Sequence, residues 1–410
     1  MENKKTNYLF PLAIIGLFFF AIGFAFGING FLTPVLKGSL TNISTFQANL
    51  LIVVNFIPFL IFSYPAAQCI KAIGYKRTMA VSFILFAIAF GLFVPATSTQ
   101  SIWFFLIACF VSGIANTILQ AAVNPYITIL GPIESAAQRM SIMGICNKLA
   151  WPTTTVFMLL VIGKTDVANI QLGELYTPFY IIIAIFIALA VVSLIAPLPE
   201  VTAEGETGDA EATDTVASAS ASYAQGKTSI WQFPHLILGA ITLFLYVGVE
   251  TISLSTITDY TSSLGLADSL PQWVLYIPSL GMCAGYIIGA TMIPRFISQV
   301  LAMRICAIVA LLGSIAVCVL PAELSVYSLF LMGLGCSLMW PALWPMAMAD
   351  LGPFTKDGAA LLTTAIAGGA AMPAVRAWIE GLSCYQTSYW ACVPCFLVIV
   401  WYGFFGYKVR

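Results

Sequence analysis

Charged residues are scarce in this sequence. Asp, Glu, Lys and Arg make up 8% of the 410 residues, whereas hydrophobic residues make up 60%. A soluble domain of ordinary composition carries about a quarter charged residues, which keep its surface in water. We therefore expect an integral membrane protein rather than a soluble one. The net charge of −1 and the lack of any basic stripe exclude nucleic acid as an expected partner.

The sequence also lacks the residue sets of most enzymes. It has one histidine, His235, and no Ser-His-Asp set, HExxH motif, phosphate-binding loop or dinucleotide-binding glycine pattern in a fitting context. Its ten cysteines lie almost all inside apolar runs, and the pair Cys392 and Cys395 has no second pair to complete a metal site. We predict no enzyme activity, no metal and no cofactor. Without a nucleotide site, transport energy would have to come from an ion gradient.

Apolar runs fill most of the chain. A spanning helix needs about 20 mostly apolar residues, and a helix satisfies its own backbone hydrogen bonds in lipid. The runs cover 9–36, 46–70, 78–96, 102–130, 140–163 and 176–197 in the first half, and 234–260, 271–293, 299–320, 325–349, 358–379 and 385–407 in the second. The sequence therefore predicts an all-α integral membrane protein with twelve transmembrane helices in two six-helix bundles.

A polar stretch separates the two sets of runs. Residues 199–232 contain an acidic run followed by an Ala/Ser tract, which is too polar to bury a core and predicts a disordered linker. The predicted domains are an N-terminal bundle, 1–198, the linker, 199–232, and a C-terminal bundle, 233–410. Most Lys and Arg fall on the side of the membrane that holds the linker. The positive-inside rule then predicts a multi-pass protein of a bacterial inner membrane, with both termini and the linker in the cytoplasm.

Three carboxamides form a stripe inside the expected fourth span. Asn116, Gln120 and Asn124 follow one another at intervals of four residues, so they share one face of an otherwise apolar helix. Such a stripe either lines a polar cavity or makes hydrogen bonds between helices. We favour the cavity.

Ionisable residues inside the expected spans are few, and each is costly to bury in lipid. Lys148, beside Asn147, lies roughly 12 Å beyond the start of the fifth span at 1.5 Å per residue, a depth that disfavours snorkelling and favours cavity lining. Glu250 is the acidic residue most clearly inside a span. Protonation, or pairing with a cation such as Lys148, would relieve its burial. Arg376 and Glu380 lie one turn apart and are expected to pair with each other.

Two prolines interrupt the expected tenth span. They lie in the run Met339-Trp-Pro-Ala-Leu-Trp-Pro345, where Pro341 directly follows Trp340. Broken helices at membrane depth occur mainly beside a cavity or protein neighbours. The aromatic face of Trp340 could stack on the apolar face of a sugar ring. Other tryptophans, Trp103, Trp390 and Trp401, are interpreted as interfacial belt residues.

Four segments carry a family resemblance. The most specific is Gln120-Ala-Ala-Val-Asn-Pro-Tyr126, which runs into Leu130-Gly-Pro132. The others are Ser44-Thr-Phe-Gln-Ala48, Ile73-Gly-Tyr-Lys-Arg77 and Tyr246-Val-Gly-Val-Glu250. They resemble the major facilitator superfamily, and within it the fucose and glucose/galactose permease branch. The resemblance implies the major facilitator fold, alternating access and a hexose bound between two bundles. It also implies a cytoplasmic gating loop at Gly74, Lys76, Arg77 and Arg139.

The chain departs from the family pattern at two coupling positions. In the proton-coupled fucose permeases an Asp on helix one and a Glu on helix four carry coupling, and the matching residues here are Gly30 and Gln120. Glutamine at the second position also occurs in the glucose/galactose branch, which favours a glucose-like hexose. Asn147 matches the family's sugar-contacting Asn, but Lys148 stands where a small neutral residue is usual. Its ammonium could replace a coupling cation or favour an acidic sugar.

The leading hypothesis is therefore a secondary active transporter of a hexose-type sugar. The expected sugar-binding residues are Asn116, Gln120, Asn124, Asn147, Lys148 and Trp340. Glu250 is the coupling candidate, and the expected partners are the sugar, a co-transported H⁺ or Na⁺ and the lipid bilayer around a monomer. The alternatives are an exporter of another small polar or anionic metabolite, a non-transporting membrane sugar sensor whose acidic linker binds a cytoplasmic partner, and a membrane-embedded enzyme, which the single His235 disfavours.

Overall fold

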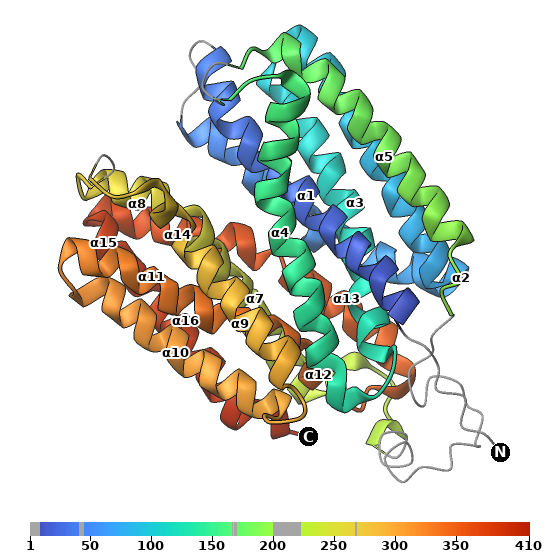
Figure 1. Ribbon diagram of the computed structural model, residues 1–410. Helices are drawn as coiled ribbons and strands as arrows, with labels where there is room; N and C mark the ends of the chain where they lie inside the picture. The colour runs from blue at the N-terminus through green and yellow to red at the C-terminus, as the bar shows by residue number, and fades with distance from the viewer. Residues whose placement is uncertain (1–8, 41–44, 166, 168–169, 200–222, 267–268) are drawn as a thin grey trace. The chain divides into compact units, whose positions relative to one another are not determined.

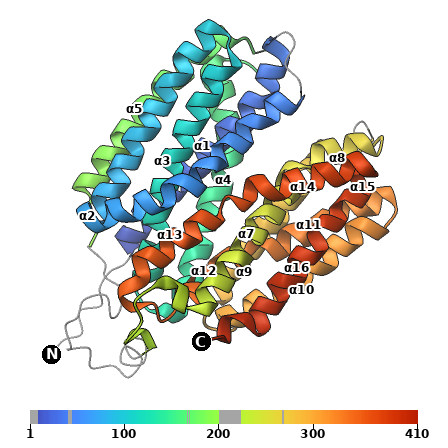
Figure 2. The ribbon, with the colours of Figure 1, turned by 180° about the vertical axis from the view of Figure 1, so that it is seen from behind.

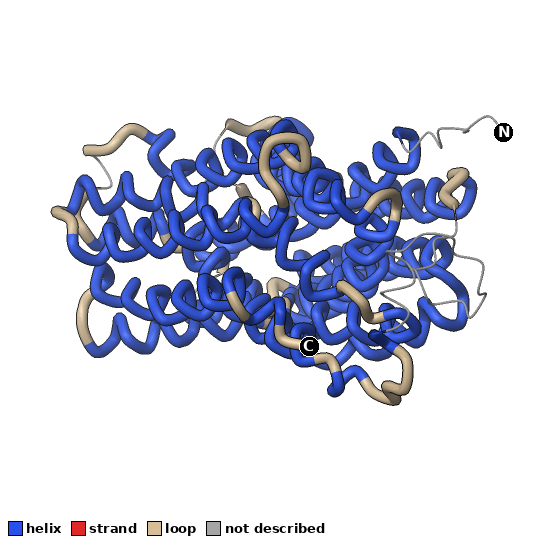
Figure 3. The backbone as a smooth tube through the Cα atoms, turned by 90° about the horizontal axis from the view of Figure 1, so that it is seen from below, coloured by secondary structure: helices blue, strands red, loops and turns tan. Residues whose placement is uncertain are grey.

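A computed structural model describes residues 9–40, 45–165, 167, 170–199, 223–266 and 269–410. Every regular element in these ranges is a helix (Figure 3). Eleven stretches are long and apolar enough to cross a membrane. One of them, Val53–Thr99, has 47 residues, about 70 Å of helix against an apolar layer about 30 Å thick. It bends at Gly74, where the backbone is not helical, so it provides two crossings. The predicted all-α architecture with twelve crossings is confirmed.

The described residues belong to two compact units. The first comprises the described residues within Met1–Gly131 and Cys146–Val201. Its elements are α1 (Leu9–Ser39), α2 (Thr45–Thr99), α3 (Ile102–Ile129), the later part of α4 (Ala136–Ile162), the 3₁₀ turn η3 (Leu172–Leu175) and α5 (Tyr176–Ile195) (Figure 1). The long α2 packs along both α3 and α5. Phenylalanines fill this contact, and the rings of Phe86 and Phe186 stack with centroids 4.8 Å apart.

The second unit comprises the described residues within Pro132–Ile145 and Thr202–Arg410. It holds η1 (Ile133–Ser135), the start of α4, η4 (Ile230–Gln232), α7 (Pro234–Ser255), α8 (Ile257–Ser263), η5 (Gln272–Tyr276), α9 (Ile277–Met292), α10 (Gln299–Val319), α11 (Ala322–Ser337), α12 (Met339–Met348), η6 (Gly352–Phe354), α13 (Thr355–Ala365), α14 (Gly368–Leu382), α15 (Tyr385–Ser388), η7 (Tyr389–Ala391), α16 (Cys392–Phe404) and η8 (Gly406–Lys408). Helix α14 lies beside α7, and α16 lies beside α10 (Figure 2). Pro132–Ile145 thus groups with the second unit, although the predicted boundaries placed it in the first bundle.

Three expected spans of the second unit are interrupted. Helix α7 stops before α8 at Thr256, α11 stops before α12 at Leu338, and α13 is separated from α14 by Ile366 and Ala367. The prolines after Leu338 predicted the second break, because proline cannot donate the backbone hydrogen bond of a helix interior. The other two breaks have no proline, and the sequence did not predict them.

Gly74 forms the bend within α2. Its φ of 79° and ψ of 170° lie in a region that is essentially restricted to glycine. We expect Gly74→Ala to lower the free energy of unfolding by roughly 1–3 kcal/mol, measured as a lower melting temperature of the detergent-solubilised protein. Gly91→Ala is the control, because a Cβ at this helical position of α2 would meet no atom within 4 Å. Equal melting temperatures for the two variants would contradict the role given to Gly74.

Most of the predicted linker, residues 200–222, lies outside the described residues, as does Ser44 of the family motif that opens the second span. The last part of the linker is described and packs on the second unit. The Lys227 ammonium lies 3.3 Å from the centre of the Tyr223 ring and 4.2 Å from that of Phe233. The guanidinium of Arg410 also lies near the Tyr223 ring, 5.3 Å from its centre. The linker therefore ends in folded structure before α7 begins.

Candidate functional site

Two carboxamides on α3 pair with each other. The side chains of Asn116 and Gln120 are buried, and Gln120 Nε2 donates a 3.0 Å hydrogen bond to Asn116 Oδ1. Neither side chain makes another hydrogen bond within the part of the chain that the structure describes. An acceptor, Gln120 Oε1, and donor hydrogens on Asn116 Nδ2 thus remain available on neighbouring turns. Neighbouring sugar hydroxyls present the same combination of donor and acceptor groups, so this pair is suited to bind a sugar edge.

Asn124 extends the stripe toward the end of α3. It lies roughly 12 Å from Asn116 along the axis, at 1.5 Å per residue. Its side chain is fully buried, and neither Oδ1 nor Nδ2 has a hydrogen-bond partner among the described residues. Nearby, the Tyr126 hydroxyl donates to the carbonyl oxygen of Pro199 at 2.8 Å. The stripe is therefore longer than one hexose ring, and Asn124 lies at its terminal end.

A second buried polar cluster of the first unit was not predicted. Asn55 Nδ2 donates to the Cys109 carbonyl at 3.2 Å, and Cys109 Sγ donates to Asn29 Oδ1 at 3.5 Å. Asn29 Nδ2 and Asn55 Oδ1 have no partner among the described residues, although both side chains are buried. Each is a single Asn in an apolar run, so no periodic pattern marked it. The neighbouring Gly30 is exposed, and a Cβ there would meet no atom within 4 Å.

Asn147 and Lys148 lie on the part of α4 that belongs to the first unit. Asn147 Nδ2 donates to the Phe19 carbonyl of α1 at 3.2 Å. The two helices approach closely there, since a Cβ on Gly23 would clash with the Asn147 carbonyl. Lys148 is half-buried, with its ammonium 5.9 Å from the centre of the Trp151 ring. Asn147 thus holds α1 against α4 in this structure, and the sugar-binding role of both residues stays a prediction.

Glu250 and Trp340 lie on neighbouring helices of the second unit. The Glu250 carboxylate forms one polar cluster with the hydroxyls of Tyr246 and Tyr286. The Tyr246 hydroxyl donates to the Cys336 carbonyl at 3.1 Å, at the end of α11. The Trp340 ring lies 6.4 Å from the Tyr246 ring, centre to centre. The predicted aromatic residue on α12 and the predicted coupling residue on α7 therefore lie next to the same tyrosine.

The sequence analysis did not identify two residues that lie around this cluster. Tyr286, on α9, contacts Gly144 of α4 so closely that a Cβ there would clash with the ring. Trp344 stacks on Trp340 with ring centres 5.3 Å apart, is fully buried, and leaves Nε1 without a hydrogen-bond partner among the described residues. Only its position four residues after Trp340 signalled that the two rings share a helix face.

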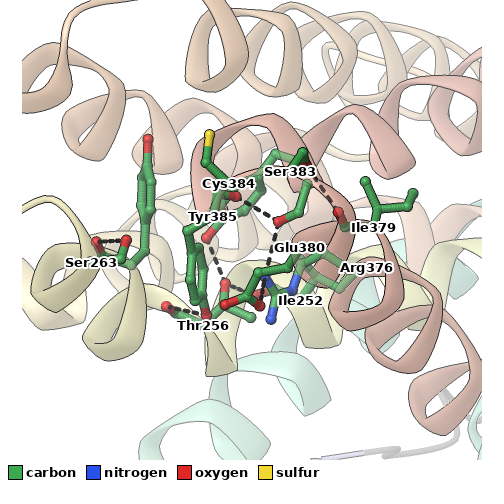
Figure 4. A network of polar contacts seen from close by, with 12 residues as sticks. Ile252, Thr256, Ser263, Arg376, Ile379, Glu380, Ser383, Cys384 and Tyr385 are labelled. Atoms are coloured by element: carbon green, nitrogen blue, oxygen red, sulfur yellow. Dashed lines mark hydrogen bonds and ion pairs between the residues drawn. The ribbon is translucent and has the colours of Figure 1, made fainter.

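Arg376 and Glu380 pair with each other on α14, as predicted. Arg376 Nη1 lies 3.0 Å from Glu380 Oε2 and donates to Ser388 Oγ at 3.0 Å. The guanidinium lies 4.3 Å from the centre of the Tyr385 ring (Figure 4). The Tyr385 hydroxyl in turn donates to the Thr256 carbonyl at 3.3 Å, at the break between α7 and α8. This network joins α7, α14 and α15, so its role is to hold three helices together.

We expect Arg376→Leu to destabilise the second unit by roughly 1–3 kcal/mol, because it removes charge-assisted hydrogen bonds and the contact with the Tyr385 ring. The measurement is the melting temperature of the purified protein. Glu380→Gln is the matched control and should have a smaller effect, because the Glu380 side chain is 35% exposed and water can replace its partner. A change in sugar affinity without a change in melting temperature would contradict the structural role.

The predicted gating residues fall in both units. Gly74 makes the bend of α2, the Lys76 carbonyl accepts a 3.0 Å hydrogen bond from Ser193 Oγ, and Arg77 is exposed. Arg139 belongs to the second unit and is buried, and its Nη1 donates to the Pro132 carbonyl at 3.0 Å and to Ser135 Oγ at 2.6 Å. The gate itself stays a prediction.

Comparison with known proteins decides the family. The sequence profile of the Major Facilitator Superfamily matches residues 14–374. The chain belongs to the major facilitator superfamily. Among superfamily members, a glucose/galactose transporter of Brucella abortus is 31% identical over 413 residues, which cover 99% of this chain and 96% of that protein. An L-fucose-proton symporter of Escherichia coli is 24% identical, over 92% of this chain and 88% of the symporter.

The fold comparison agrees. A crystal structure of the superfamily transporter FucP in the outward conformation matches with a TM-score of 0.79, over 98% of this chain and 100% of FucP, at 22% identity. At this identity the match shows the major facilitator fold alone. The predicted resemblance to the fucose and glucose/galactose branch is confirmed by the named relatives.

Proposed function

We propose that this chain is a secondary transporter that carries a hexose-type sugar across the membrane by alternating access. The pair of Asn116 and Gln120 supports the proposal most directly, because it offers a free donor and a free acceptor on a buried helix face. Relatives named as glucose/galactose transporters, which match nearly the whole chain, support a glucose-like substrate. The central position of the sugar between the two bundles is part of this proposal and rests on the family resemblance.

The other predicted residues have distinct proposed roles. Asn147 and Lys148 donate hydrogen bonds to the sugar, Trp340 stacks on its apolar face, and Asn124 lines the path beyond it. Glu250 is the proposed coupling residue, because it is a carboxylate inside a helix of the second unit and lies beside two tyrosine hydroxyls. Gly30 and Gln120 provide no carboxylate at the first-half positions, so coupling to H⁺ or Na⁺ would depend on the second half.

The remaining proposals concern the oligomeric state, the membrane location and the partners of the protein. We infer a monomer in a bacterial inner membrane, with both termini in the cytoplasm, because basic residues concentrate on that side. We also infer that the chain has no enzyme activity and no nucleic-acid partner. The test of orientation is the labelling of single introduced cysteines in whole cells with a membrane-impermeant reagent.

The deciding experiment is uptake of labelled hexoses into proteoliposomes, with and without imposed proton and sodium gradients. We expect glucose or galactose to accumulate with one of these gradients. Transport of acidic sugars alone would instead give the half-buried Lys148 a role in selecting an anion. Binding of sugar without flux would support a sensor, and accumulation of an unrelated solute from inverted vesicles would support an exporter. Either of the last two results would overturn the proposed function.

A further inference from the structure

The end of α16 holds an arginine of α10 in a fixed position. Arg304 Nε donates a 2.9 Å hydrogen bond to the Gly403 carbonyl, and Arg304 Nη2 donates to the Tyr407 hydroxyl at 3.4 Å. The guanidinium lies 4.7 Å from the centre of the Phe404 ring. These contacts orient the planar group and leave Nη1 without a hydrogen-bond partner in the described ranges. Arg304 thus presents unused donor hydrogens from a preorganised position.

The charge around this arginine is not neutralised. Lys408, which follows Tyr407, is exposed, and its ammonium lies 5.6 Å from the centre of the Tyr407 ring. Neither Arg304 nor Lys408 has a carboxylate within ion-pair distance among the residues that the structure describes. The neighbouring Arg410 differs, because its guanidinium lies 2.7 Å from Asp350 Oδ2. Two positive charges therefore remain available at this end of α10 and α16.

Apolar side chains next to these charges face outward. Trp401 lies on α16 and Phe405 directly follows this helix, four residues later; they are 44% and 63% exposed, and the Trp401 ring lies against Gly406. Leu301 and Ile305 lie one turn apart at the start of α10 and are 43% and 48% exposed. In a membrane protein such side chains meet acyl chains, and tryptophan prefers the level of the headgroups. The combination is a positive, donor-rich spot bordered by a lipid-facing apolar surface.

We propose that Arg304, Tyr407 and Lys408, bordered by Trp401 and Phe405, form a binding site for the phosphate of an anionic glycerophospholipid. The guanidinium and the ammonium bind phosphate oxygens, because charge-assisted hydrogen bonds to phosphate are strong and arginine matches its geometry. The acyl chains lie along the outward faces of α10 and α16. Basic spots at the membrane surface favour anionic lipids in this way. The site is independent of the sugar pathway and does not rest on the proposed transport function.

The test titrates the purified full-length protein in detergent with phosphatidylglycerol and phosphatidylethanolamine and counts bound lipids by native mass spectrometry. We expect the wild-type protein to prefer phosphatidylglycerol. Lys408→Gln should reduce this preference roughly fivefold, since one basic residue near the surface contributes about 1 kcal/mol. Arg304→Gln should reduce it at least as much, and Arg304→Lys should retain part of it. The Lys408 side chain makes no hydrogen bond among the described residues, so its variant separates binding from folding.

The matched control is Arg295→Gln. Arg295 is exposed, has no carboxylate partner among the described residues, and lies over the Phe296 ring at 5.3 Å. Its replacement removes the same charge and should change lipid preference less than twofold. The proposal is overturned if the wild-type protein shows no preference, if Lys408→Gln and Arg304→Gln retain it, or if Arg295→Gln reduces it equally, which would indicate general attraction rather than a site.

Discussion

Replacement of Gln120 by leucine is expected to lower hexose uptake at sub-saturating sugar roughly 5- to 150-fold. Leucine has a similar size but removes the Oε1 acceptor offered to the sugar, and it leaves Asn116 Oδ1 without its 3.0 Å hydrogen bond. A buried polar group that loses its partner costs about 1–3 kcal/mol, and 1.4 kcal/mol corresponds to a factor of ten. The measurement is the initial rate of labelled hexose uptake into proteoliposomes that contain equal amounts of protein.

Thr117→Val is the control for this substitution. Thr117 is buried on the same helix, but its hydroxyl donates to the Gly113 carbonyl of that helix at 2.8 Å. Its removal should change uptake less than twofold, because no substrate bond is lost. If Gln120→Leu transports at the wild-type rate, the amide pair is structural, and the proposed sugar site loses its main support.

Glu250→Gln is expected to abolish accumulation of sugar against its gradient while sugar exchange across the membrane continues. Glutamine keeps the size and hydrogen-bonding capacity of the side chain, but it can neither bind and release a proton nor balance a cation. The Tyr246 and Tyr286 contacts should therefore persist, and sugar should equilibrate to equal concentrations inside and outside. Concentrative uptake and counterflow exchange, measured on the same proteoliposomes, separate loss of coupling from loss of binding.

Asp259→Asn provides the comparison for this variant. Asp259 is an exposed carboxylate on α8, in the same unit as Glu250, and its neutralisation should leave both kinds of uptake intact. Continued accumulation by Glu250→Gln under an imposed gradient would assign coupling to another residue. Loss of exchange as well as accumulation would instead make Glu250 part of the sugar site.

The sequence predicted the architecture because the relevant signals are local. Runs of about 20 apolar residues mark membrane helices directly. The four-residue spacing from Asn116 to Gln120 predicted that the two side chains share one helix face, where the structure joins them by a hydrogen bond. The paired charges of Arg376 and Glu380 were predictable for the same reason, since residues four apart face each other on a helix.

Other features depend on contacts between segments distant in sequence. Asn55 reaches Cys109, and Tyr286 packs on Gly144, and neither pair is connected by any periodic pattern. The break at Thr256 contains no proline or glycine, so no local residue type marks it. The Thr256 carbonyl instead accepts a hydrogen bond from Tyr385, which is distant in sequence. Asn147 was predicted to bind the sugar, but nothing in the sequence indicated that its amide donates a hydrogen bond to the Phe19 carbonyl of α1.

The open space at Gly30 has an evolutionary consequence. A side chain added there would displace nothing, since its Cβ would meet no atom within 4 Å. Gln120 differs from a glutamate by one amide group, so a carboxylate of the same size would fit there as well. The first unit could thus acquire ionisable groups at Gly30 and Gln120 by point mutation, with its helices left in place.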